Sequence, residues 1–242
     1  MTTHSSGPQR LYLMQIAARS APDVQWSTPY PCYLVQMGDG KRVLIDSGFP
    51  QNLDLSARPG LQLRKNVVEQ LALLDLQPED IDILVCTHFD FDHCGHHGDF
   101  PKAQLVVQRE HYEVAHGGHP RFAPSRPYWD LPAERYRFVD GDTTLLPGLE
   151  LIATGGHVPG HQSVLIRLPQ TGPVLLTIDA VAAQGNFKPD RQAGPMDLDG
   201  EKAIASTRKL LDLAQREHVT LTIFGHDGPQ WETLKKLPEY YQ

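Results

Sequence analysis

The stretch Cys86-Thr87-His88-Phe89-Asp90-Phe91-Asp92-His93-Cys94-Gly95 carries four candidate metal ligands within six positions, directly after the apolar run 82–86. These candidates are His88, Asp90, Asp92 and His93. A solvated charge run would not be interleaved with phenylalanines. A core strand would not hold this many ionisable groups, because burying them unpaired is costly. A bound metal removes the conflict, since imidazole and carboxylate are metal ligands. The stretch therefore predicts a metal site at the end of a buried strand.

Three more candidate ligands follow predicted strands further along the chain. His157 lies in a glycine-rich turn after 149–153, Asp179 ends the run 174–178, and His226 follows 219–224. Any one of them alone is better explained as a helix cap or a core histidine. Four strand ends that all carry donors favour one cleft, into which a rigid scaffold points several ligands.

The rest of the chain indicates an α/β protein. Its 242 residues are 40% hydrophobic and 21% charged, and no linker or repeat divides them, so a single domain over 1–242 is expected. Two packed sheets with helices outside are predicted. Strands are expected at 10–17, 32–37, 42–46, 82–86, 104–107, 149–153, 163–168, 174–178 and 219–224, and helices at 64–75, 108–116 and 199–216. Segments 51–63 and 117–135 are expected to be loops over the cleft.

Net charge and the distribution of apolar residues indicate which classes of partner and which cellular location to expect. The net charge of −7 argues against nucleic acid, which binds basic faces. No apolar run approaches a membrane span and the N-terminus lacks a signal-peptide pattern, so no membrane partner and a cytoplasmic location are expected. Cys32, Cys86 and Cys94 fit neither a disulfide framework nor a zinc ribbon, and packing roles are expected for them, with a role near the metal as the alternative for Cys94.

The candidate ligands resemble the signature of the metallo-β-lactamase superfamily, His-x-His-x-Asp-His followed by a distant His, Asp and His. Within it the chain most resembles the N-acyl-homoserine lactone lactonases, which are quorum-quenching enzymes. The similar stretches run from about residue 30 to the C-terminus and include VLIDSGFP, THFDFDHCG, VVQREHYE, TGGHVPGHQS and VLLTIDA.

This resemblance implies an αββα sandwich, with two mixed β-sheets flanked by helices, and a hydrolase with two divalent metal ions. One ion would be held by His88, Asp90 and His157, and the other by Asp92, His93 and His226. Asp179 would bridge the two ions together with a hydroxide that attacks a lactone carbonyl, and Asp46 would support the ligands from behind. Asp92 is the expected catalytic acid for the leaving alkoxide. Zinc is the expected metal, with Mn, Fe and Co as alternatives, and a homodimer is an open alternative to a monomer.

Two positions depart from the lactonase pattern. Asp90 stands where the pattern has histidine, and its carboxylate favours harder metals. Ala182 stands where many of these lactonases have a tyrosine, for which Tyr128 or Tyr136 is a candidate substitute. The departures keep three alternatives open: a thioesterase or phosphotriesterase on the same site, a metal-dependent redox protein, and a non-catalytic binding protein.

The substrate's acyl side is expected to meet apolar loop residues. The candidates are Phe49, Phe89, Phe91, Phe122, Tyr128 and Trp129. Arg121, Arg126 and Arg135 are candidates to meet an anionic group of the ligand, with a solvated surface role as the plainer alternative for each.

Overall fold

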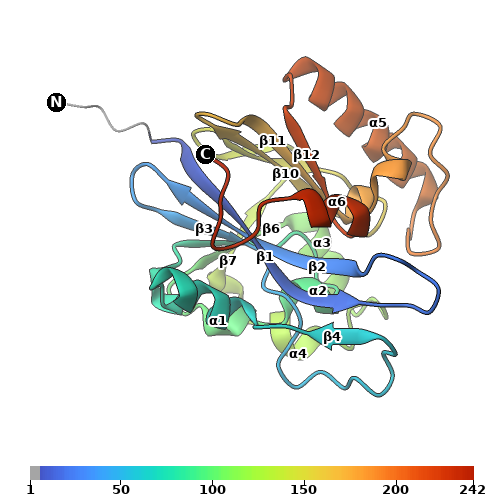
Figure 1. Cartoon of the computed structure of the whole chain (residues 1–242). Coiled ribbons are helices and arrows are strands. Elements are labelled where there is room, and N and C mark those ends of the chain that lie inside the picture. The colour runs from blue at the N-terminus through green and yellow to red at the C-terminus, as the bar shows by residue number, and fades with distance from the viewer. Residues whose placement is uncertain (1–5) are drawn as a thin grey trace.

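The computed structural model describes residues 6–242, whose strands form two sheets packed against each other (Figure 1). The first sheet has seven strands in the spatial order β4 (Leu61–Leu63), β1 (Pro8–Arg19), β2 (Thr28–Met37), β3 (Arg42–Ile45), β5 (Ile83–Val85), β6 (Gln104–Gln108) and β7 (Tyr136–Val139). The second has five, in the order β12 (Leu221–Phe224), β11 (Gly172–Ile178), β10 (Gln162–Leu168), β9 (Leu149–Ala153) and β8 (Thr143–Leu146). Both sheets are mixed, because β3, β5, β6 and β7 run parallel in the first, β11 and β12 run parallel in the second, and the remaining pairs are antiparallel.

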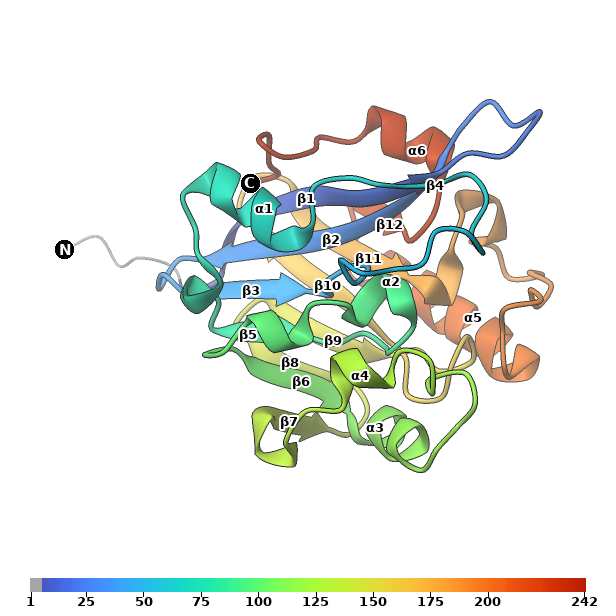
Figure 2. The ribbon, with the colours of Figure 1, turned by 90° about the horizontal axis from the view of Figure 1, so that it is seen from below.

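Helices cover the outer face of each sheet. They are α1 (Val67–Leu71), α2 (Phe91–Cys94), α3 (Arg109–His116), α4 (Arg126–Trp129) and α5 (Gly200–Arg216). Helix α6 (Gly228–Thr233) differs, because its Trp231 packs into the core cluster between the two sheets. Figure 2 shows α1 to α4 on the side of the first sheet, and α5 on the opposite side of the molecule, against the second sheet. The order of layers is helix, sheet, sheet, helix, and the predicted αββα sandwich is confirmed.

Strand alternation builds the core in layers. On β1, Leu11 and Leu13 point into the cluster between the two sheets, while Tyr12 and Met14 point into the cluster under α1 and its neighbours. This is the period of two that strand geometry imposes. A third cluster packs α5 against the second sheet through residues such as Leu210. Both faces of each sheet are therefore buried, which makes the scaffold rigid where the strands end.

Some predicted elements differ from the structure. The predicted helix at 64–75 is shorter, because Asn66 caps α1 together with Glu69 and the chain tightens into a 3-10 turn after Leu71. The loop 117–135 contains α4, and the loop 51–63 contains β4. Strands β7 and β8 and helices α2 and α6 had no prediction. Helix α6 begins with Asp227 as N-cap before Pro229, which is an ordinary helix-start signal.

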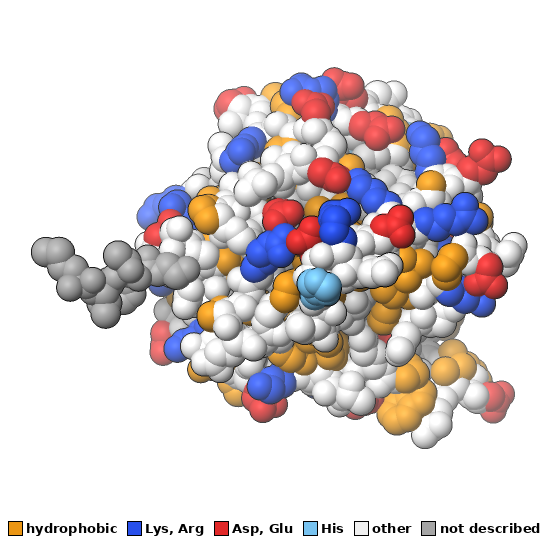
Figure 3. All heavy atoms as spheres, turned by 90° about the horizontal axis from the view of Figure 1, so that it is seen from above, with side chains coloured by type: hydrophobic (Ala, Val, Ile, Leu, Met, Phe, Trp, Pro, Cys, Tyr) orange, Lys and Arg blue, Asp and Glu red, His pale blue; other side chains and the backbone are white. Residues whose placement is uncertain are grey.

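On the face seen in Figure 3, acidic and basic side chains are interspersed rather than gathered by sign. Among the helices of residues 6–242, none combines the length and the apolar character needed to cross a bilayer.

Candidate metal centre

Tight backbone turns position the ligands at one edge of the two sheets. Gly156 has φ +136, and a Cβ there would lie 2.2 Å from the backbone nitrogen of Ala203, so only glycine lets the turn before His157 pack against α5. Ile178 has φ 51 and ψ −135, a strained conformation for a β-branched residue, directly before Asp179. The strained turn redirects the chain as β11 ends and points Asp179 into the site.

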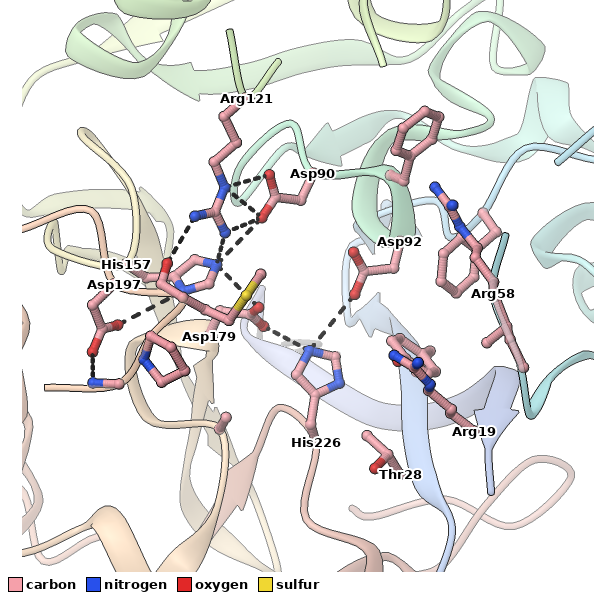
Figure 4. Close-up of a pocket in the computed structure, with 18 of the residues that line it drawn as sticks. Arg19, Thr28, Arg58, Asp90, Asp92, Arg121, His157, Asp179, Asp197 and His226 are labelled. Atoms are coloured by element: carbon pink, nitrogen blue, oxygen red, sulfur yellow. Dashed lines mark hydrogen bonds and ion pairs between the residues drawn. The ribbon is translucent and has the colours of Figure 1, made fainter. Parts of the chain in front are cut away.

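The structure brings all seven predicted ligands together. Their donor atoms form three groups, each within 4.8 Å: His88, Asp90 and His157; His88, His93 and Asp179; and Asp92, His93 and His226. We call His88, Asp90 and His157 the first half of the centre, and Asp92, His93 and His226 the second half. Figure 4 shows part of this arrangement, with His226 between Asp179 and Asp92.

Asp179 lies between the halves and turns one oxygen to each. Its Oδ2 is 3.3 Å from His157 Nε2 and 3.9 Å from His88 Nε2. Its Oδ1 is 3.1 Å from His226 Nε2 and 3.5 Å from His93 Nε2. A carboxylate in this position can bridge two cations.

The donor atoms fit a pair of divalent cations. Within the described part of the chain, Nε2 of His88 and Nε2 of His93 are buried and have no hydrogen-bond partner. Buried polar atoms are normally satisfied, because leaving them unpaired is costly. Each of these nitrogens faces a carboxylate oxygen, at 3.4 Å from Asp90 and 3.2 Å from Asp92 respectively. Cations between them would satisfy both kinds of atom with ligands that zinc accepts.

The electrostatics of the cluster favour positive charge. Burial would raise the pKa of Asp179, but His226, His93 and His157 hold that pKa well below its ordinary range. Burial would lower the pKa of His157, yet the carboxylate of Asp179, with Asp197 and Asp90, raises it to about 9. The same competition, with Asp92 and Asp46 outweighing burial, raises the pKa of His93 well above its ordinary value. The carboxylates thus raise the pKa values of His157 and His93, which shows that the cluster favours positive charge.

Asp46 supports the second half from behind. Its Oδ2 accepts hydrogen bonds from His93 Nδ1 (2.7 Å) and from the Thr87 hydroxyl (2.7 Å), and its Oδ1 accepts one from the Thr87 backbone nitrogen (2.8 Å). On the other ligand of this half, His226 Nδ1 donates to the Pro29 carbonyl (2.8 Å). Bonds of this kind fix the ring orientation and leave Nε2 for a metal.

Arg121 contacts two of the three donors of the first half. Its guanidinium binds Asp90 with Nε 2.9 Å from Oδ1 and Nη2 2.6 Å from Oδ2, and Nη2 is also 2.9 Å from His157 Nε2. Nη1 donates to the Met196 carbonyl (2.7 Å) and so reaches the opposite loop. The carboxylate that replaces the usual histidine therefore comes with a compensating positive charge. Arg121 was predicted to bind an anionic group of the ligand, whereas in the structure it binds Asp90.

The centre opens into a pocket of about 740 Å³, a size suited to a small-molecule ligand. Phe49 and Phe91 line it, as predicted. Assigning Phe89, Phe122 and Trp129 to the substrate wall is wrong, because all three are fully buried in the core. Their hydrophobic contacts hold the 117–135 segment in place instead of facing a ligand.

The other predicted pocket residues also lie elsewhere. Tyr136 is buried and its hydroxyl donates to the Trp129 carbonyl, and the Tyr128 hydroxyl bonds Asn52, so neither lines the pocket. Arg126 pairs with Asp130, and Arg135 bonds the Phe100 carbonyl. The tyrosine that does line the pocket is Tyr30, with its ring centroid 5.0 Å from that of His226. Position 30 lies outside every motif in the sequence, so only the fold reveals it.

Comparison with known proteins agrees with this geometry. The family model described as the metallo-beta-lactamase superfamily matches residues 28–226. An N-acyl homoserine lactonase from a Bacillus species is 32% identical over 224 residues, covering 88% of this chain and 86% of its own. The N-acyl homoserine lactonase AttM from Rhizobium johnstonii is 30% identical and covers 98% of this chain and 96% of its own.

A solved structure gives the same result at the level of the fold. It is an N-acyl homoserine lactone hydrolase with the product N-hexanoyl-L-homoserine bound at its catalytic metal centre. It superposes with a TM-score of 0.82 at 27% identity, covering 97% of this chain and 100% of that one.

Proposed function

The chain belongs to the metallo-beta-lactamase superfamily, and we propose that it is a two-metal hydrolase that opens the ring of an N-acyl homoserine lactone or a related lactone. The observation that carries the proposal is Asp179, whose two oxygens face two separate sets of donors at the base of a pocket. The lactonase relatives supply the substrate class, since they match nearly the whole chain.

The seven ligands would hold two divalent ions, with the two halves as the donor sets and Asp179 shared between them. When bound, the ions would supply a Lewis acid for the carbonyl and a lowered pKa for water. We propose zinc, because imidazole nitrogens and carboxylate oxygens are its common ligands, with Mn, Fe or Co as substitutes.

Residues of the chain would transfer the proton and bind the substrate. In the reaction, water adds to the lactone carbonyl carbon, the ring carbon–oxygen bond breaks, and a proton goes to the departing alkoxide. Asp92 lines the pocket beside His226 and is our candidate for carrying that proton. Burial raises the pKa of the Tyr30 hydroxyl, which keeps it protonated as a hydrogen-bond donor to a substrate oxygen. Tyr30 is our candidate to replace the tyrosine that the pattern lacks at Ala182.

The test combines metal content with turnover. Protein purified without chelators is analysed for metals, and lactone opening is followed with a pH indicator. We expect about two metals per chain, and Asp92→Asn should lower turnover by about a hundredfold or more, as loss of a general acid does. Asp142→Asn is the control, because Asp142 is an exposed acid bound to Lys209. Turnover that persists without metal, or two bound metals with no lactone opened, would contradict the proposal.

Three expectations from the sequence stay predictions. They are the cytoplasmic location, the homodimer and the lack of a nucleic-acid partner.

A further inference from the structure

Two arginines line the pocket on the side away from Arg121. Arg19 ends β1, and Arg58 lies in the loop before β4. Figure 4 shows both on the Asp92 side of the pocket, opposite Arg121. Neither arginine is one of the metal donors, so the two charges are available to another part of a ligand.

The fold holds these two side chains near each other. Arg19 pairs with Leu61 in the β1–β4 register, and its Nε donates to the Pro59 carbonyl (3.3 Å). The guanidinium carbon of Arg58 lies 5.0 Å from the ring centroid of Phe91, a cation–π arrangement. Both guanidiniums are thus positioned by contacts with the pocket wall.

Neither arginine forms an ion pair within residues 6–242, whereas the two other arginines of the pocket do. Arg121 is paired with Asp90, and Arg191 with Asp197. Asp54, the acid closest to Arg58 along the chain, accepts a hydrogen bond from the Ser56 backbone nitrogen (2.9 Å) and feels the charge of Arg58 without forming an ion pair with it. A solvated surface role is the ordinary explanation for an exposed arginine. It does not explain two such charges that face one cavity.

Charge balance makes the wall attractive to anions. The pocket is lined by four arginines and four aspartates, so its formal charges cancel without metal. Asp90 and Asp197 are already paired, and Asp92 and Asp179 face the cation positions. Adding two divalent cations makes the pocket strongly positive, and Arg19 and Arg58 extend that potential toward the mouth.

We propose that Arg19 and Arg58 form a carboxylate-binding subsite, and that the preferred substrate is a lactone whose acyl chain ends in a carboxylate. Phe49, Leu61 and Phe91 line the same pocket and provide apolar surface for the chain of such a ligand. The lactone part of this inference rests on the proposed function, while the binding of the carboxylate does not.

Binding is tested on the zinc-loaded protein by calorimetry. The probes are straight-chain dicarboxylates from succinate to suberate, each compared with the monocarboxylate of the same length. Both members of a pair can place one carboxylate at the metals, so their difference reports the second carboxylate. We expect the best dicarboxylate to bind about tenfold tighter than its partner, equivalent to about 1.4 kcal/mol.

The variant Arg19→Met/Arg58→Met removes both charges and keeps side chains of similar length. It should abolish the preference for the dicarboxylate. Arg137→Met is the matched control, because Arg137 is exposed on β7 and does not line the pocket. The proposal is overturned if wild type shows no preference, if the double variant keeps it, or if the control loses it equally.

Turnover separates this inference from the function on which it rests. N-adipoyl and N-hexanoyl homoserine lactone are compared by kcat/KM in the same variants. A preference for the adipoyl compound that only the double variant loses supports the subsite. Equal kcat/KM in every variant overturns the subsite and leaves the lactonase proposal standing. If neither lactone is opened, the lactonase proposal fails, and the calorimetry still decides whether the subsite binds carboxylates.

Discussion

The two halves of the metal centre offer similar donors and each has a carboxylate behind one histidine, but arginines accompany only the first half. Behind the second half, the buried carboxylate of Asp46 binds the far side of His93. Behind the first half, Asp197 is 3.8 Å from His157 Nδ1 and is paired with Arg191. On the metal side of this half, the Arg121 guanidinium binds Asp90 and approaches the metal-binding nitrogen of His157. A carboxylate behind a ligand increases its affinity for a cation, and a guanidinium beside a ligand competes with the cation. We therefore expect the second half to fill first.

Removing the charge of Asp46 should have the largest effect on the difference in metal affinity between the two halves. Asp46→Asn keeps an acceptor for Thr87 but weakens the support of His93, and losses of this kind lower metal affinity by about 10–100-fold. The tight phase of a cobalt titration, followed by absorption, should shift accordingly. Asp99→Asn is the control, because Asp99 binds His96, which is not a ligand (2.6 Å). If Asp46→Asn leaves the tight phase unchanged, the carboxylate of Asp46 is not what makes the second half bind metal more tightly.

Removing Arg121 should have a smaller effect, of opposite sign, on the weak phase. Arg121→Met frees Asp90 and removes a positive charge near the first cation position, so affinity there should rise by about tenfold. Arg121→Lys should lie between wild type and Arg121→Met, since it keeps the charge but loses the two-pronged contact. A fall in affinity would instead mean that Arg121 holds Asp90 in its binding position.

The smallest expected effect concerns a histidine close to the second half. Burial, with the nearby positive groups, lowers the pKa of His97 to about 3. Between an unfolded pKa of about 6.5 and this value, the unfolded chain binds one more proton than the folded one, so stability falls as the pH falls. In metal-free protein, His97→Gln should reduce the pH slope of the unfolding free energy by up to about 1.4 kcal/mol per pH unit.

His116→Gln is the control for this slope, because His116 is exposed on α3. An unchanged slope in His97→Gln would show that His97 is not kept neutral by the fold. The pKa of His97 would then not differ from that of His93 in the way described, with one lowered and the other raised.

The sequence predicted the fold and the seven donors that the fold brings together, because both leave local patterns. Apolar runs that end in His or Asp mark buried strands and their donors, and the confirmed superfamily resemblance orders those donors into a site. Asp46 was predicted as a support by the same resemblance. The partners of the first half leave no such pattern: Arg121 is 31 residues from Asp90, and only the path of the 117–135 segment brings them together.

Aromatic residues were the least predictable part of the site. Phe89 and Phe91 are two residues apart in the central motif, yet Phe89 stacks on Trp129 in the core while Phe91 lines the pocket. The sequence does not distinguish them, because the direction of each side chain depends on where α2 begins. Tyr30 reaches the pocket through the position of β2 beside the end of β12, which is a property of the packed sheets.

The strained backbone at Ile178 links the stability of the fold to the position of Asp179. Together with Asp46, which has φ 59, it holds non-glycine residues in a conformation that costs about 1–3 kcal/mol each. Selection for heat resistance alone would favour glycine at such positions. A variant that relaxes the turn before Asp179 would therefore have a higher melting temperature. The carboxylate of Asp179 would then no longer be held in its position at the site. At these two turns, the backbone strain lowers the stability of the fold and places a carboxylate at the site.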